Sequence, residues 1–214
     1  MFIKYIIDQI MKQFVSPNDP ILVKIAKEIP IAKIDSKEIQ DIISLMLKVS
    51  YGQQRQKKKP VLVGLAAPQI GISKRIILVD VKADGKGQVG GVHVYINPEI
   101  TWTSKRKGEW YEGCFSTGKV CGIVSRPVSI KIKAHILGLK AKKYTGYLAR
   151  IFQHEIDHLN GKVFVDHITN PDNLHWVEKR EFPLYRNQQA WKNWPKKCSF
   201  EKWKSLKSPL LKQA

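Results

Sequence analysis

The sequence predicts an α+β fold in which antiparallel or mixed β-sheets surround a helix in the C-terminal half of the chain. Further helices are expected near the N-terminus, and an extra basic tail near the C-terminus. Two observations predict this class. Segments with strand-like patterns gather in the middle of the 214-residue chain and are flanked by segments with helical spacing. The two kinds of segment do not alternate strictly, as they would in a parallel α/β fold.

One helix and two strands are predicted in the N-terminal half. Asp35 opens a capping-box pattern, and apolar residues follow it at helical spacing. The polar and basic segment 51–60 predicts an exposed loop. Segments 75–81 and 92–100 are rich in β-branched residues and predict two strands, which a glycine-rich turn at 85–91 separates.

An amphipathic strand and a helix are predicted in the C-terminal half. Apolar and polar residues alternate from 128 to 136, which is typical of a strand with one buried and one wet face. Residues 137–143 predict a loop, and a helix is expected over 145–159. A helical projection gives this helix an apolar, inward face and an opposite polar face that consists of Arg150, Gln153, Asp157 and Asn160.

The character of the sequence changes after Ile168, so we expect a domain at 1–168 and a C-terminal extension at 169–214. The extension is dense in lysine and contains four of the six tryptophans. Its pattern is too irregular to predict helices. The alternatives are that it wraps around the domain, docks on a partner or is partly disordered, with packing on the domain favoured for the tryptophans.

The charge of the chain is strongly basic. Thirty-seven Lys and Arg residues outnumber 18 Asp and Glu residues, which gives a formal net charge of +19. Such a surface attracts polyanions, and the attraction weakens as salt rises. RNA, a ribosome or an anionic membrane face are candidate partners, and a solvated basic surface in a lysine-biased proteome explains the charge equally well.

The cysteine content and the apolar segments bear on the compartment. Three cysteines do not make a disulfide framework, which favours a reducing compartment. Charged residues interrupt the apolar segment 1–15, so it does not resemble a signal peptide. Nothing approaches the roughly 20 apolar residues of a membrane-spanning helix. We therefore expect a cytoplasmic protein without a membrane partner.

The predicted helix 145–159 carries the motif H-E-x-x-H. Two imidazoles four positions apart on a helix lie one above the other, so His154 and His158 can reach one ion. Glu155 lies beside that ion and can take a proton from water. Burying these groups without partners would cost several kcal/mol, and a metal that binds the imidazoles removes much of that cost. The motif predicts a metal-dependent hydrolase.

A third protein ligand is needed, and several candidates are open. A metzincin would have a histidine at position 164, where this chain has Phe164, so that class is disfavoured. A thermolysin-like peptidase would use a glutamate about twenty residues downstream, and Glu178 and Glu181 lie at that distance. Cys114 is the candidate upstream of the helix.

Three segments taken together resemble the peptide deformylase family. Residues 64–71 read Gly-Leu-Ala-Ala-Pro-Gln-Ile-Gly, residues 111–116 read Tyr-Glu-Gly-Cys-Phe-Ser, and the helix carries His-Glu-Ile-Asp-His-Leu. The order G-x-A-A-x-Q, E-G-C-x-S and H-E-x-x-H-L is far more specific than any one motif. The resemblance covers about 20–168 and leaves the basic extension outside.

The resemblance implies an activity and a metal centre. The activity is removal of the formyl group from the N-terminal methionine of newly synthesised polypeptides, with release of formate. Glu155 would be the general acid/base, while the Gln69 side chain and the backbone N–H of Phe115 would stabilise the oxyanion. The implied cofactor is one divalent metal, Fe(II) first, with Zn, Co and Ni as alternatives. Its implied ligands are Cys114, His154 and His158.

Substrate contacts are implied at the backbone of Gly64 and at Arg126. An apolar methionine pocket would be lined by Val63, Trp110, Tyr147 and Ile151. The chain departs from the family pattern at Leu62, where glycine is usual, and at Phe115, where leucine or methionine is usual. Segment 117–122 lacks the usual proline and arginine, so substrate contacts there do not carry over.

Two other functions remain open at this stage. One is a thermolysin-like zinc peptidase that uses Glu178. The other is a non-enzymatic, basic module that binds the ribosome or RNA, in which the tryptophans stack on bases. Its docking element would be the lysines of the extension, which are Lys192, Lys196, Lys197, Lys202, Lys204 and Lys207.

Three further side chains carry weaker expectations. Glu112 is predicted either to be a turn residue or to accept a hydrogen bond that orients another group. His167 and His175 are expected on the surface.

Overall fold

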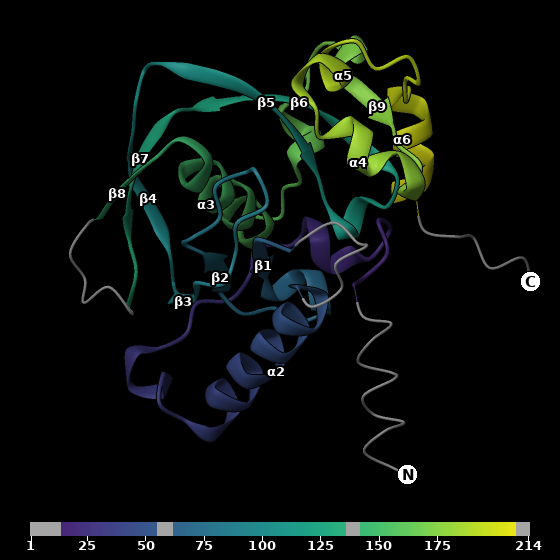
Figure 1. Ribbon diagram of the computed structural model, residues 1–214. Helices are drawn as coiled ribbons and strands as arrows, with labels where there is room; N and C mark the ends of the chain where they lie inside the picture. The colour runs from purple at the N-terminus through teal and green to yellow at the C-terminus, as the bar shows by residue number, and fades with distance from the viewer. Residues whose placement is uncertain (1–13, 55–61, 136–141, 209–214) are drawn as a thin grey trace, which may run out of the picture.

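The computed structural model describes residues 14–54, 62–135 and 142–208. Within these residues, three three-stranded antiparallel sheets surround a long helix, α3 (Gly146–Leu159). Figure 1 shows α3 inside the strands, with a second helix below it and the C-terminal helices at the upper right. The predicted α+β class with antiparallel sheets is confirmed.

The first sheet consists of β1 (Gly64–Ala66), β2 (Ile76–Asp80) and β3 (Val92–Ile96), in that order. Every residue of β2 is buried because both of its faces are covered. Alternate residues of β2 pack against α2 (Lys37–Gln54) on one side and against α3 on the other. This sheet therefore fixes the position of α3 relative to the N-terminal part of the chain.

The second sheet consists of β4 (Glu99–Thr103), β7 (Ser129–Lys133) and β8 (Lys142–Thr145), with β7 in the middle. The alternation predicted for 128–136 is confirmed in β7, whose buried residues face α3. The single strand predicted at 92–100 is wrong, because β3 and β4 belong to different sheets. The chain turns at Asn97, which has φ 48° and whose side chain bonds to the backbone of Ile29.

The third sheet consists of β5 (Lys107–Gly113), β6 (Val120–Pro127) and β9 (Leu174–Trp176). The sequence motifs did not predict β5 and β6, although β6 is rich in valine and isoleucine. β9 comes from the C-terminal extension and pairs with β6. His175 lies in β9 and is buried, so its predicted surface position is wrong.

The rest of the extension packs on the third sheet. It forms α4 (Phe182–Tyr185), α5 (Gln188–Lys192) and α6 (Phe200–Lys207). Three of its tryptophans are buried, and Figure 1 shows these helices grouped beside β5, β6 and β9. Packing on the domain is thus the arrangement adopted. The division at residue 168 stays a prediction, although β9 joins both parts in one sheet.

Several boundaries differ from the predicted ones. Helix α2 begins two residues after Asp35 and continues through Gln54 into the predicted loop 51–60. Residues 55–61 and 136–141 lie outside the described residues, and β8 begins within the predicted loop 137–143. The predicted polar face of α3 is only partly exposed. Asn160 is exposed, whereas Gln153 is buried and donates to the backbone oxygen of Pro127 at 3.0 Å.

Short 3₁₀ helices link the larger elements: η1 (Pro20–Val23), η2 (Ile31–Lys33), η3 (Ala67–Ile70), η4 (Phe115–Thr117), η6 (Phe164–His167), η7 (Pro171–Asn173) and η8 (Lys179–Glu181). No helix in the described part of the chain is both long enough and apolar enough to span a bilayer.

Candidate metal centre and active site

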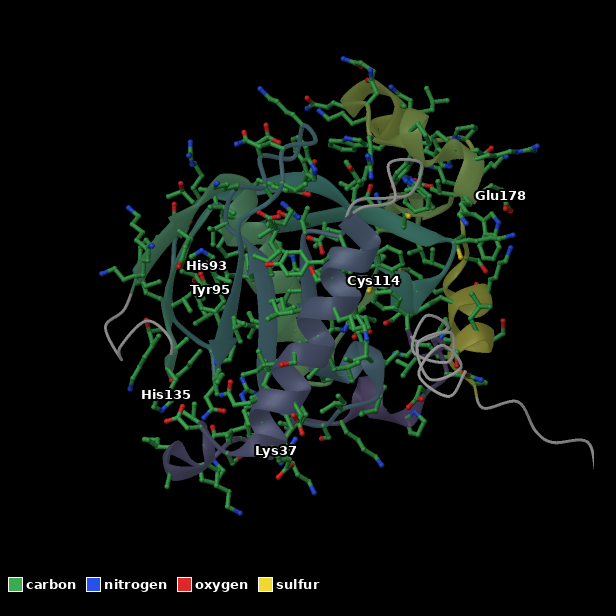
Figure 2. All side chains as sticks on the ribbon, turned by 60° about the horizontal axis from the view of Figure 1, so that its bottom comes forward. Lys37, His93, Tyr95, Cys114, His135 and Glu178 are labelled. Atoms are coloured by element: carbon green, nitrogen blue, oxygen red, sulfur yellow. The ribbon has the colours of Figure 1, made fainter. Side chains whose placement is uncertain are left out.

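Helix α3 and the end of strand β5 bring the predicted metal ligands together. His154 and His158 lie one turn apart on α3, and Cys114 follows the last residue of β5. One ligand atom of each residue lies within 4.8 Å of the other two. Cys114 Sγ is 3.4 Å from His158 Nε2. Figure 2 shows Cys114 in the interior of the view, away from its edges.

The local chain path explains why Cys114 points at the helix. Cys114 has extended backbone angles (φ −140°, ψ 144°), so it continues the direction of β5. Immediately after it, the chain turns into η4, and the backbone N–H of Ser116 donates to Cys114 Sγ at 3.4 Å. The thiol is therefore held at the end of a strand, opposite the two histidines.

The surroundings of Cys114 favour its thiolate. Burial alone would raise the pKa of the thiol, but His158 and His154 beside it hold that pKa well below the usual range. The thiolate is the form of cysteine that binds metals. Cys121, by contrast, is fully buried, and burial raises the pKa of its thiol.

Glu112 bonds to His154 on the side of the imidazole ring that faces away from the ion site. One carboxylate oxygen is 2.9 Å from His154 Nδ1, and the carboxylate also accepts from Arg126 at 2.7 and 2.9 Å and from Arg150 at 2.6 Å. Burial opposes ionisation of Glu112, but Arg126 and His154 lower its pKa well below the usual range. Glu112 is therefore an acceptor that orients His154 and leaves Nε2 free to bind an ion.

Glu155 lies beside the ligands with a buried carboxylate. Burial raises its pKa to about 7, although the charges of His154 and His158 oppose that rise. A Cβ added at Gly64 would overlap this carboxylate, so glycine in β1 is what makes room for it. Among the described residues, Glu155 Oε2 has no hydrogen-bond partner.

The two predicted oxyanion donors also lie at this centre. Gln69, in η3, accepts from the backbone N–H of Ala66 at 2.6 Å and donates to Cys114 Sγ at 3.1 Å. The first bond identifies which amide atom is the nitrogen, and that nitrogen carries a second hydrogen. Phe115 is the first residue of η4 and lines the same cavity, and an N–H in a first turn has no partner within its own helix.

The residues present fit a divalent metal. A thiolate and two imidazoles form a donor set suited to Zn or Fe. Both histidines come from one rigid helix, and their rings lie 5.1 Å apart. Among the described residues, Glu155 Oε2 is buried beside these ligands without a partner. Water or substrate held at the centre would satisfy this atom.

A cavity of about 500 Å³ opens from this centre. Its lining includes Gly64 and the four side chains predicted to form the methionine pocket, which are Val63, Trp110, Tyr147 and Ile151. Arg126 does not line this cavity, so the structure does not bring it to the position predicted for a substrate contact. It is buried, and its guanidinium bonds to Glu112 and to Asp157, the latter at 2.7 Å.

The downstream glutamates lie away from the centre. Glu178 bonds to Lys119 at 2.8 Å and accepts from Trp176 Nε1 at 2.9 Å, and Figure 2 shows it at the edge of the molecule, well away from Cys114. Glu181 caps the backbone of Glu178 at 2.9 Å. At position 164, where a metzincin would have a histidine, the ring of Phe164 stacks on His154 with ring centroids 6.1 Å apart. Neither glutamate is placed to complete the metal site.

Sequence reasoning missed several residues of the cavity. Tyr111 and Arg150 line it, as do residues of the loop 85–89 and four residues of the extension, Phe182, Arg186, Asn187 and Gln188. The helical projection places Arg150 on the polar face of the predicted helix, opposite the inward face. If β5 had been predicted, its alternate residues Trp110 and Glu112 would have been expected on one face of the strand. That face could then have been placed beside the helix that carries Arg150.

The fold and the site together define a class of protein, namely an α+β hydrolase with a possible metal site of one cysteine and two histidines. Comparisons with known proteins identify the family within that class. A family model described as polypeptide deformylase matches residues 11–174. The chain belongs to the peptide deformylase family.

Curated relatives support this assignment. Peptide deformylase from Polynucleobacter necessarius subsp. necessarius is 39% identical over 155 residues, which cover 71% of this chain and 81% of that protein. Peptide deformylase from Natranaerobius thermophilus is 37% identical over 161 residues, which cover 73% of this chain and 91% of that protein. The activity of the chain is therefore removal of the N-formyl group from nascent peptides.

Solved structures agree with the fold. A probable peptide deformylase from synechococcus phage S-SSM7 has a TM-score of 0.60 and 35% identity, covering 73% of this chain and 99% of its own. A class I type b peptide deformylase from Acinetobacter baumannii, with Met-Ala-Ser bound, has a TM-score of 0.63 and 31% identity. That match covers 72% of this chain and 96% of its own.

Proposed function

We propose that the deformylase reaction of this chain takes place at one divalent metal held by Cys114, His154 and His158, with Glu155 as the general acid/base. The observation that supports this most directly is the convergence of the three ligand atoms within 4.8 Å beside a buried glutamate. The substrate is the N-formyl-methionyl end of a newly made polypeptide, and the products are formate and a free amine.

The roles of the protein groups follow from the chemistry of a formamide. When bound, the metal supplies Lewis acidity that activates water and polarises the formyl oxygen. Glu155 takes the proton of the attacking water and later gives it to the departing amine nitrogen. The second hydrogen of Gln69 Nε2 and the N–H of Phe115 bond to the oxygen as negative charge develops on it. One such donor is worth about 3–4 kcal/mol.

The methionine side chain would lie in the apolar part of the cavity. Val63, Trp110, Tyr147 and Ile151 line it. Burial there would fix the formyl group relative to Glu155 and Gln69, and holding reactants in place lowers the barrier. Gly64 contributes the backbone beside Glu155, where a substrate chain lies closest to β1.

Fe(II) is the proposed metal, with Zn, Co and Ni as alternatives. A thiolate ligand is soft and adds negative charge, which suits Fe and Zn, and availability in the cell decides between metals of similar fit. Metal analysis of protein purified without oxygen measures the occupant directly.

The proposed role of Glu155 is tested by Glu155→Gln. This change keeps the shape of the side chain but removes the proton acceptor, so formate release should be lost while bound metal stays near one per chain. Formate production and metal content are measured on the same sample. Full turnover by this variant would show that another group moves the proton.

A paired substitution separates this site from a thermolysin-like one. Cys114→Ser should disturb metal content, because it removes the thiolate. Glu178→Gln should leave metal content unchanged, because Glu178 is bonded to Lys119 and Trp176 at the surface. The opposite result would favour the peptidase reading.

Ribosome binding through the lysines of the extension remains a separate prediction. Lys192 is exposed, whereas Lys196 pairs with Glu181 and Lys207 lies 3.8 Å from Asp166. The buried tryptophans of the extension support packing rather than base stacking. Salt-sensitive co-sedimentation of ribosomes with the chain tests this prediction. If binding survives replacement of these lysines by glutamine, the extension is not the docking element.

A further inference from the structure

The outer part of the active-site cavity is walled by the C-terminal extension. Phe182, Arg186, Asn187 and Gln188 face a cavity whose inner end holds Cys114 and the histidines. The family model matches only as far as residue 174, so these four residues lie beyond the matched part. This wall is a feature that the extension adds to the site.

Aromatic packing anchors this wall to the third sheet. Tyr185 is fully buried, its hydroxyl is 2.8 Å from His175 Nδ1, and its ring packs edge-on to Tyr111 at 5.4 Å. Trp191 is also fully buried and lies 6.1 Å from Trp110. Since Trp110 and Tyr111 belong to β5, the strand that leads to Cys114, helices α4 and α5 are fixed relative to the metal ligands (Figure 1).

The wall comes close to the catalytic centre. A Cβ added at Gly113 would lie 3.6 Å from Phe182 Cε1, so this ring lies beside the residue that precedes Cys114. Arg186 follows Phe182 by four residues and caps the end of α4. Residues at this spacing lie on the same side of a helix, so both side chains face the cavity.

Arg186 brings a positive charge to this wall. None of the ion pairs formed within residues 14–54, 62–135 and 142–208 involves Arg186. Burial raises the pKa of the hydroxyls of Tyr111 and Tyr147, and the nearby charge of Arg186 opposes that rise. Both tyrosines line the cavity, so the guanidinium charge acts on the space that substrate enters.

A second cationic side chain lines the cavity. The loop 85–89 contributes Lys86 to the lining. The carboxylates of the lining are Glu112, which is bonded to Arg126, Arg150 and His154, and Glu155 at the metal centre. Both lie at the inner end. A peptide that leaves the methionine pocket therefore passes two lining cations, Arg186 and Lys86.

We propose that Arg186 is a specificity-determining residue that binds an acidic side chain on the substrate residues after formylmethionine, so that chains with Asp or Glu there are preferred. This inference rests on the deformylase function. Guanidinium and carboxylate form charge-assisted hydrogen bonds. Because Arg186 is exposed, we expect a preference of about three- to fivefold, which falls with salt.

The test compares kcat/KM for formyl-Met-Glu-Ala-amide and formyl-Met-Gln-Ala-amide, and for the pair with Glu or Gln in the third position. The full-length, metal-loaded enzyme should prefer glutamate at one or both positions. The ratio should fall to near one in Arg186→Gln and persist in part in Arg186→Lys. Lys192→Gln is the matched control, because Lys192 is exposed on α5 but does not line the cavity, and it should keep the ratio.

Three results would overturn the inference. The first is a wild-type ratio near one at both positions. The second is a preference that survives in Arg186→Gln. The third is a preference seen only when the amide is replaced by a free C-terminal acid, which would assign Arg186 to a terminal carboxylate.

A binding measurement separates this inference from the function itself. The dissociation constants of the deformylated peptides Met-Glu-Ala-amide and Met-Gln-Ala-amide are compared by calorimetry, without turnover. Tighter binding of the glutamate peptide, lost in Arg186→Gln, supports the inference even if no formate is released. Equal binding in the wild type contradicts it. Absence of formate release, by itself, contradicts only the deformylase function.

Discussion

Gly64 lies so close to Glu155 that a single methyl group at position 64 would displace the general base from the metal centre. A Cβ there would overlap the carboxylate of Glu155. The sequence motif marks this glycine but does not reveal its neighbour. The contact arises because β1 runs alongside α3, and only the tertiary structure brings the two together.

Gly64→Ala should fold and bind metal but lose kcat by on the order of 10²-fold, because displacement of a catalytic group by about 1 Å has effects of that size. Gly108→Ala is the control, since its added methyl meets the side chain of Val128 at 3.1 Å, away from the ligands. Steady-state kinetics with metal quantification checks both variants. Equal kcat for Gly64→Ala and the wild type would contradict the described crowding.

Glu112 is the second residue whose neighbours decide its role. Its buried carboxylate bonds to two arginines and one histidine. Removal of its charge leaves Arg126 with Asp157 alone, and leaves Arg150 without an ion-pair partner among the described residues. The E-G-C motif identifies the position. The partners come from β6 and α3, and the register that pairs Glu112 with Gly122 could not be obtained from the sequence.

Glu112→Gln should lower the free energy of unfolding by about 3–5 kcal/mol, the usual effect of breaking a buried pair. Metal affinity should fall by about 10–100-fold, because His154 loses its orienting acceptor. Denaturant unfolding and metal titration measure the two effects. Glu178→Gln, which breaks a pair with Lys119 at the surface, should lower the free energy of unfolding far less. If both variants lose the same free energy of unfolding, burial of the Glu112 ion pairs does not contribute to stability.

At the scale of elements, the helix that carries the histidines was the easiest to predict, and the strand before Cys114 was missed. Helix α3 has a 3.6-residue pattern and a motif on one face. β5 has little hydrophobic alternation, since it faces polar partners and a cavity. The C-terminal helices α4 and α5 are too short to show a period, and the packing of Tyr185 and Trp191 gives them their stability.

Trp191→Ala should therefore lower the free energy of unfolding by about 3–5 kcal/mol, as expected for a buried aromatic residue. It should also raise KM, because α5 would lose its fixed position beside the cavity. Urea unfolding and steady-state kinetics measure both effects. Trp102→Ala is the control, because Trp102 is 44% exposed, and it should cost under about 1 kcal/mol. A Trp191 variant as stable as this control would show that the extension is not anchored there.

At the scale of the whole molecule, acid should destabilise the protein partly through His175. This residue is buried in β9 beside Tyr185, Cys121 and Lys197. Burial and the charge of Lys197 lower its pKa to about 4 from the usual 6.5. Between about pH 6.5 and pH 4, His175 is therefore protonated in the unfolded chain but neutral in the folded chain. The contribution of His175 is complete above about pH 6.5 and is lost as pH falls towards 4.

His175→Gln should make the free energy of unfolding depend less steeply on pH between 7 and 4. His93→Gln, at an exposed position of β3, should keep the wild-type slope. Denaturant unfolding at several pH values measures the three slopes. The assignment is wrong if the wild type and His175→Gln have the same slope.

The most direct test of the account is formate release from a formyl-methionyl peptide by protein purified without oxygen and with its metal quantified. Formate and free N-terminal methionine should appear in equal amounts, in proportion to bound metal. Release should disappear in Cys114→Ser together with the metal. A metal-loaded protein that releases no formate, or a Cys114→Ser variant that releases formate at the wild-type rate, would contradict the proposed centre of Cys114, His154 and His158.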